Sequence, residues 1–196
     1  MTKRKATVTR ETKETSVKVD LNIDGGSKFQ ITTGIRFFDH MLSQLAQHGV
    51  FDLKISATGS DQHHVAEDVA VTLGKAFSQA LGNRQGIVRM SHAIVPMDDV
   101  LAMVALDIGG RGYSVIEVPF SHHSISEMSA DLIHHFLVSF ASEAKINIHA
   151  KILSGVNDHH KAEAIFKALG RALDAATRID GRISTLTPST KDFIET

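Results

Sequence analysis

The chain has 196 residues, of which 42% are hydrophobic and 22% charged, an ordinary globular composition that is long enough for one large core or two small ones. Its formal net charge of -1 gives no reason to expect nucleic acid or an acidic membrane surface as a partner. Cysteine is absent, which excludes disulfides, zinc-thiolate sites and cysteine nucleophiles.

The first residues, MTKRKATVTR, are basic, but no apolar run of signal-peptide length follows them. No stretch approaches the roughly 20 apolar residues of a membrane-spanning helix. We therefore expect a cytoplasmic protein.

In chain order, alternating polar and apolar residues first predict strands at 15–24 and 28–33, separated by a turn. A helix is predicted at 35–49, because its apolar residues recur at i, i+3, i+4 and i+7 and a glycine ends it. A strand at 51–59 and a helix at 64–82 follow.

The second half repeats this order. Strand-like segments lie between residues 91 and 120, and the middle one, VLAMVALDIGG, is apolar enough to lie at the centre of a sheet. A helix at 132–144, a strand at 144–153 and a helix at 159–176 complete the unit.

The two halves also match residue by residue, which indicates an internal duplication. We assign 1–88 to the first half and 89–196 to the second half with a C-terminal tail. The predicted fold class is α+β: each half has a mostly four-stranded sheet with two helices on one face, and the halves share a core. The second helices agree at His63/His159, His64/His160, Ala66/Ala162, Glu67/Glu163, Leu73/Leu169, Gly74/Gly170 and Ala76/Ala172.

The string HHxAE stands at the start of both second helices. For a single copy, helix capping or a solvated surface would be the better explanation. Here both histidines and the glutamate persist while their neighbours change from Val65 to Lys161 and from Asp68 to Ala164. Imidazole and carboxylate ligands without thiolate suit Mn, Fe or Zn. The repeat therefore predicts metal sites.

Adjacent histidines on a helix project about 100° apart, so each pair should serve two ions. As a hypothesis, each ion takes ligands from both halves. His122, His123 and His134 have no counterpart in the repeat and are expected at the surface or supporting the site. The predicted sets are His63, Glu67, His135 and His160 for one ion and His159, Glu163, His40 and His64 for the other.

Lys167 lies on the predicted metal-binding face, where the other half has Val71. Arg89 and Arg111 could join it to bind an anion, although each arginine alone is more typical of an ordinary surface. The segment PSTK (188–191) could add hydroxyl and amide donors.

The chain resembles a known family, imidazoleglycerol-phosphate dehydratase, in its monofunctional form. The resemblance runs from TKET at 12–15 to PSTK at 188–191. It implies a duplicated α+β unit, a homo-oligomer of 24 subunits with active sites between subunits, and two manganese ions per site. The segments that carry it are FFDHMLSQLAQHGVFDL, DQHHVAEDVAVTLG, ALDIGGRGY, HHFLVSFA and NDHHKAEAIFKALGRAL.

The resemblance also implies roles for individual residues. The chain departs from the family pattern at Asp192, where glycine is usual, and at Asp99, where glutamate is common. The implied metal ligands are His40, His63, His64, Glu67, His135, His159, His160 and Glu163. The implied substrate contacts are Glu14, Arg89, Arg111, Lys167, Ser189 and Lys191, the last five near the phosphate. The candidate acid–base groups are Glu14, Glu67 and Glu163.

The implied reaction is a hydro-lyase step of histidine biosynthesis. Imidazole-glycerol phosphate loses water to give imidazole-acetol phosphate, through a metal-bound imidazolate and a diazafulvene-type intermediate. A metal-storage or metal-sensing protein and a dinuclear metallohydrolase are the alternatives. The second of these usually relies on bridging carboxylates, and this histidine-rich set offers few.

Overall fold

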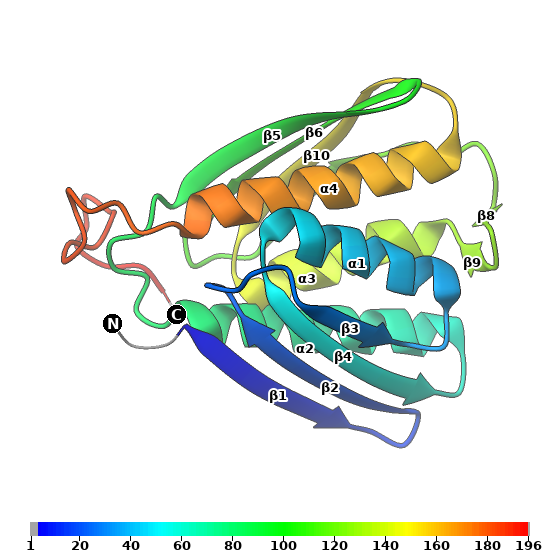
Figure 1. Cartoon of the computed structure of the whole chain (residues 1–196), viewed down its shortest axis with the longest axis horizontal. Helices are drawn as coiled ribbons and strands as arrows, with labels where there is room; N and C mark the ends of the chain where they lie inside the picture. The colour runs from blue at the N-terminus through cyan, green and yellow to red at the C-terminus, as the bar shows by residue number, and fades with distance from the viewer. Residues whose placement is uncertain (1–3, 196) are drawn as a thin grey trace.

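The computed structural model of the chain describes residues 4–195, in which two four-stranded sheets enclose a layer of four helices (Figure 1). The predicted α+β class with two similar halves is confirmed. Within the described residues, no helix is both long and apolar enough to cross a membrane.

The first half forms one sheet in the order β1-β2-β4-β3, in which β3 runs parallel to β4 and the other pairs are antiparallel. Strand β1 was not predicted, because its alternating residues are only half buried at the sheet edge. The elements are β1 (Lys5–Glu11), β2 (Thr15–Asn22), β3 (Phe29–Thr32), α1 (Arg36–Gly49), β4 (Asp52–Gly59) and α2 (Gln62–Leu81).

The second half repeats this topology as β5-β6-β10-β7, with β7 parallel to β10. The predicted central position of the VLAMVALDIGG strand is confirmed, because β6 lies inside the sheet. A small hairpin, β8–β9, is an addition of this half. The elements are β5 (Met90–Met97), β6 (Val100–Asp107), β7 (Tyr113–Glu117), β8 (Ser124–Ile125), β9 (Met128–Ser129), α3 (Asp131–Ala144), β10 (Asn147–Ser154) and α4 (Asp158–Thr177).

The helices pair across the halves, because α1 packs on α4 and α2 packs on α3. Aromatic rings join the two pairs: Phe136 of α3 lies 5.5 Å from Phe38 of α1 and 5.2 Å from Phe166 of α4, measured between ring centroids. All three side chains are fully buried. The expectation that the halves share a core is therefore confirmed, and residues of opposite halves are brought side by side at the helix ends.

Candidate active site

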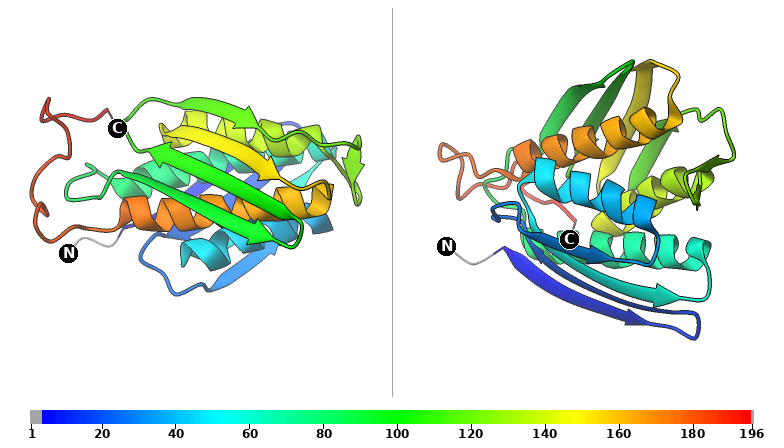
Figure 2. Two further views of the ribbon diagram at one scale, coloured as in Figure 1. Left: turned by 90° about the horizontal axis from the view of Figure 1, so that it is seen from above. Right: turned by 45° about the vertical axis from the view of Figure 1, so that its right-hand side comes forward.

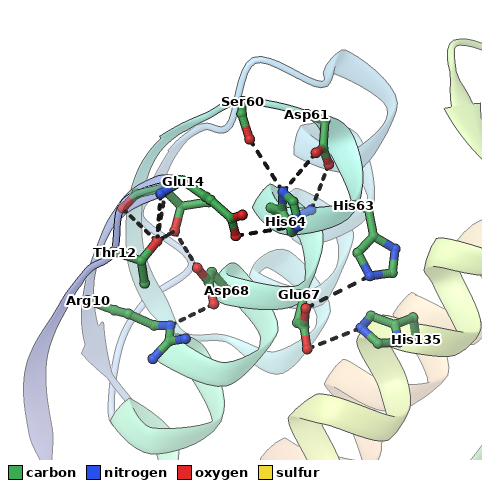
Figure 3. Close-up of polar contacts among 11 residues, drawn as sticks. Arg10, Thr12, Glu14, Ser60, Asp61, His63, His64, Glu67, Asp68 and His135 are labelled. Atoms are coloured by element: carbon green, nitrogen blue, oxygen red, sulfur yellow. Dashed lines mark hydrogen bonds and ion pairs between the residues drawn. The ribbon is translucent and has the colours of Figure 1, made fainter.

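The first cluster of candidate ligands lies between α2 and α3 (Figure 3). His63 Nε2 is 3.9 Å from one carboxylate oxygen of Glu67, and His135 Nε2 is 3.6 Å from the other. His63 and Glu67 come together because they stand four residues apart on one helix, whereas His135 arrives from the opposite half. Ligand atoms of all three lie within 4.8 Å of one another.

One buried nitrogen of this cluster makes no hydrogen bond with the described residues. His135 Nε2 is buried and makes no hydrogen bond, although it faces the Glu67 carboxylate. A buried polar atom without a hydrogen bond costs free energy unless something else satisfies it. A divalent cation between His63, Glu67 and His135 would satisfy this nitrogen, so the residues fit a metal ion.

The second cluster lies between α1 and α4 and has the same composition. His40 Nε2 is 3.2 Å and His159 Nε2 is 3.3 Å from the same Glu163 oxygen. The other Glu163 oxygen lies 2.7 Å from Lys167 Nζ. Burial of Glu163 opposes its ionisation, but the hydrogen bonds from Lys167 and His40 outweigh it and hold the Glu163 pKa below its ordinary value. The carboxylate is therefore ionised and able to bind a cation.

His64, the other histidine of the first pair, turns away from both clusters. Asp61 caps α2 by accepting a hydrogen bond from the His64 backbone N–H, and its carboxylate lies 2.7 Å from His64 Nδ1. The second ring nitrogen, Nε2, is 3.5 Å from Glu14 at the β1–β2 turn (Figure 3). Asp61 thus orients the ring, and Nε2 is the atom left for a ligand or a proton.

His160 is held in the same way by the β5–β6 turn. Its Nδ1 lies 2.8 Å from Asp99, and its Nε2 lies 3.4 Å from Asp98. Asp99 also accepts hydrogen bonds from the backbone N–H groups of Val156 and Asn157. The hydrogen bond from His160, followed by these two, lowers the pKa of Asp99 well below its usual range.

A single chain does not bring the predicted four-ligand sets together. The clusters contain His63, Glu67 and His135, and His40, His159 and Glu163, without His160 or His64. The physical reason is the divergence of adjacent residues at the first turn of a helix, reinforced by Asp61 and Asp99. In each pair the two adjacent histidines point in different directions, and their service to two different ions stays a prediction.

A basic groove of about 700 Å³ lies against the C-terminal tail. Arg89 pairs with Asp107 at 2.7 Å, which raises the Arg89 pKa, and donates to the Pro188 carbonyl at 2.7 Å. The Lys191 N–H bonds the Ser189 hydroxyl, which fixes the tail locally. The lining residues include Arg89, Arg111, Ser189, Thr190 and Lys191.

Within one chain this groove does not meet the ligand clusters. His159 stands at the start of α4, whereas the Arg89 N–H bonds the Ala176 carbonyl near the end of that helix. At 1.5 Å per residue, these ends are about 26 Å apart. The expected convergence of Arg89 and Arg111 with Lys167 does not occur in a single chain; only Lys167 lies beside a cluster. Figure 1 shows the C-terminal tail leaving the far end of α4.

Sequence reasoning did not identify the aspartates that support the site. Asp61 had a signal, because it stands at the N-cap position directly before a predicted helix. Asp158 had a weaker sequence signal. In the structure it forms a buried ion pair with Lys161 at 2.9 Å and bonds His122 at 2.8 Å. These contacts hold residues 119–122 against the start of α4. His123 and His134 line a shallow cavity beside His122.

A duplicated α+β sandwich with two histidine–carboxylate clusters and a separate basic groove defines a candidate enzyme whose clusters could hold metal ions. Comparison with known proteins identifies the family of this enzyme. Residues 33–173 match the family described as imidazoleglycerol-phosphate dehydratase. The chain belongs to this family.

The relatives support the assignment along the whole chain. The imidazoleglycerol-phosphate dehydratase of Dehalococcoides mccartyi strain 195 is 58% identical over 195 residues, covering 100% of both chains. That of Methanothermobacter thermautotrophicus is 52% identical, covering 97% of this chain and 98% of the relative. The family's activity is a dehydration in histidine biosynthesis, which makes it a hydro-lyase.

Solved structures show the same fold. The Staphylococcus aureus enzyme superposes with a TM-score of 0.83 at 30% identity, covering 90% of this chain and 99% of that one. The Pyrococcus furiosus enzyme, solved in complex with (S)-C348, gives a TM-score of 0.83 at 35% identity, covering 95% of this chain and 100% of that one.

Proposed function

We propose that the chain dehydrates D-erythro-imidazole-glycerol phosphate to imidazole-acetol phosphate with two manganese ions per active site, in the cytoplasm. The observation that carries this proposal is the pair of equivalent clusters, each with two imidazoles and one carboxylate, one of which contains a buried nitrogen without a hydrogen bond. Borderline nitrogen and hard oxygen ligands together suit manganese, and neither cluster contains sulfur.

We further propose that the active site is assembled from several copies of the chain, in a 24-subunit particle. Each cluster offers three ligands, fewer than the octahedral coordination typical of manganese. His64 and His160 direct Nε2 away from their own clusters, as ligands for a neighbouring copy would. The basic groove also requires a neighbour, because about 26 Å of helix separates it from the clusters in its own chain.

The groove supplies binding energy remote from the reacting atoms. Arg89, Arg111, Ser189 and Lys191 surround a space suited to a phosphate, and Lys167 adds a cation beside Glu163. Fixing the phosphate orients the glycerol carbons, so part of the entropic cost of reaction is met on binding.

Dehydration requires removal of a proton that no neighbouring carbonyl acidifies. When bound, the metal ions would lower the pKa of the imidazole N–H of the substrate. With its N–H proton released, the ring would push out the hydroxyl of the attached carbon, and that proton would complete the leaving water; the product is a diazafulvene-type species. Removal of the C–H proton on the next carbon would return an electron pair to the ring, which regains a proton on nitrogen, and would leave an enol that tautomerises to the ketone.

Glu14 is the candidate for moving that proton. Glu67 and Glu163 each face two imidazoles, as metal ligands would. Glu14 lies outside both three-residue groups, with its carboxylate exposed and 3.5 Å from His64 Nε2. A carboxylate beside the ligands but not among them is placed to accept a proton from the substrate.

The test is to incubate the metal-free protein with manganese and imidazole-glycerol phosphate and to follow product, metal content and particle mass together. We expect enol and ketone absorbance, two ions per chain and a large particle. Release of inorganic phosphate would instead indicate the metallohydrolase alternative. Tight metal uptake without turnover would indicate a storage or sensing protein.

A further inference from the structure

The β1–β2 turn, which carries Glu14, is fastened to α2 by a buried carboxylate (Figure 3). Asp68 of α2 is 7% exposed and accepts hydrogen bonds from Arg10 Nε, at 2.6 Å, and from the Thr15 hydroxyl. Arg10 lies in β1, and Thr15, also buried, directly follows Glu14 at the start of β2. A buried carboxylate costs free energy unless an opposite charge and hydrogen bonds compensate it, and Asp68 receives both. Asp68 thus ties the strands on both sides of the turn to α2.

The backbone of Glu14 is fixed at two further points. Its N–H donates to the Thr12 hydroxyl at 3.1 Å, and its carbonyl accepts from the Ser60 N–H at 3.0 Å. The turn lies at the same end of the first sheet as the start of α2 (Figure 2, right). The Glu14 side chain is 59% exposed and reaches to 3.5 Å from His64 Nε2. The backbone therefore sets the place of this carboxylate, while its oxygen atoms stay accessible.

The second half shows that the fold does not need this polar anchor. Strands β5 and β6 pair in the same register as β1 and β2, and α4 aligns with α2 through the repeated HHxAE string. The residues equivalent to the anchor are all apolar and buried, so the same packing is built there without a buried charge. Arg10 corresponds to Val95, Thr15 to Val100 and Asp68 to Ala164.

The residue equivalent to Glu14 is held in a different way. By the same register this residue is Asp99, whose own carboxylate accepts hydrogen bonds from the backbone N–H groups of Val156 and Asn157 and lies 2.8 Å from His160 Nδ1. Those bonds fix the Asp99 carboxylate directly and occupy its oxygen atoms. In the first half the anchor lies behind the turn, which leaves the Glu14 carboxylate free to exchange a proton.

We propose that Asp68 is a positioning residue for the dehydration, which acts through Thr15 and Arg10 to hold Glu14 within reach of the substrate proton. This inference rests on the proposed function, in which Glu14 moves that proton. Misplacement of a reacting group by about 1 Å can cost on the order of 100-fold in rate, so a rigid turn matters more for turnover than for stability.

Transplanting the apolar residues of the second half tests the anchor without leaving a buried polar group unpaired. The variant Arg10→Val/Thr15→Val/Asp68→Ala should keep native circular dichroism and wild-type manganese content. Its kcat should fall by about tenfold or more, with KM changed by less than about twofold, because the basic groove is untouched. Asp20→Ala is the matched control: it removes another threonine–aspartate hydrogen bond, from the Thr7 hydroxyl at 2.6 Å on the outer face of the same sheet, and should keep wild-type kcat.

A double-mutant cycle with Glu14→Gln identifies the residue through which the anchor acts. The loss of kcat caused by the anchor variant should disappear in the Glu14→Gln background. If the triple variant does not fold, Asp68→Asn, which keeps an acceptor for Thr15 but loses the charge facing Arg10, enters the same cycle with the same expectation.

The outcomes separate this inference from the proposed function. A folded anchor variant with wild-type kcat, or an equal loss of kcat in both backgrounds, would overturn the role of Asp68 and leave that of Glu14 intact. Loss of manganese in parallel with kcat would mean that Asp68 acts through its neighbour Glu67, and would also overturn it. Wild-type activity of Glu14→Gln alone would overturn the proposed role of Glu14, and this inference with it.

Discussion

Gly74 of α2 and Gly170 of α4 occupy the same position in the two repeats, and each lies where its helix crosses a helix of the opposite half. A Cβ on Gly74 would come within 2.7 Å of the Glu143 side chain and 2.9 Å of the Ala144 nitrogen in α3. A Cβ on Gly170 would come within 2.7 Å of the Leu45 carbonyl in α1. The repeated glycines thus set the close approach that brings His135 to His63 and His40 to His159.

Gly74→Ala should destabilise the fold, because backbone atoms of α3 must move away from the added methyl group. Overpacking of this kind costs roughly 1–3 kcal/mol in the free energy of unfolding. Urea titration followed by circular dichroism measures it. Gly26→Ala is the control, since no atom lies within 4 Å of the added Cβ there. Equal stabilities of the two variants would contradict the close-contact explanation.

Glu163→Gln should lower turnover by roughly 100-fold or more while the fold persists. The amide keeps the shape of the side chain but loses the charge that faces His40, His159 and Lys167. Metal content should fall with activity, as measured by elemental analysis of the purified variant. Glu143→Gln, which removes a surface carboxylate on α3, serves as the control. Near-normal activity of Glu163→Gln would remove this residue from any role at the metal.

Asp99→Asn should weaken manganese binding by about 10- to 100-fold, the usual effect of losing a carboxylate that orients a metal-binding imidazole. The asparagine can no longer hold the His160 ring as a charged acceptor, so Nε2 points outward for less of the time. Titration of the metal-free variant with manganese gives the affinity. Asp20→Asn, on the outer face of the first sheet, should leave it unchanged.

Two inactive variants should restore activity when they assemble together, if each site takes its clusters from one chain and its groove from another. Glu163→Gln damages a cluster and Arg111→Ala damages the groove. After co-expression at equal levels, about a quarter of the sites would carry both parts intact. The measurement is the specific activity of co-purified hybrids against each variant alone. Hybrids no more active than the variants would argue for a site built within one chain.

Much of the fold was predictable because helix and strand periods are strong where one face is buried. The repeat also identified both His–Glu pairs, since ligands at i and i+4 on one helix need no knowledge of tertiary structure. The edge strand β1 was not predicted, because half of its residues face solvent and its pattern of apolar residues is weak.

Contacts that depend on the tertiary arrangement were not predictable. Asp99 reaches His160 only because the β5–β6 turn lies over the start of α4. Likewise, the sequence made Arg89 and Arg111 candidate anion ligands, but the length of α4 separates them from the clusters. Sequence patterns indicated what these side chains could bind, but not which of them the fold brings close together.

The packing of helices across the two halves indicates that the chain arose from a dimer of half-length polypeptides. Each cluster takes one histidine from one half and a His–Glu pair from the other, so two separate half-length polypeptides related by a twofold axis could build both clusters. In such a homodimer every substitution appears twice. Fusion into one polypeptide removes that constraint, and it allows Lys167 to stand on one side where Val71 stands on the other.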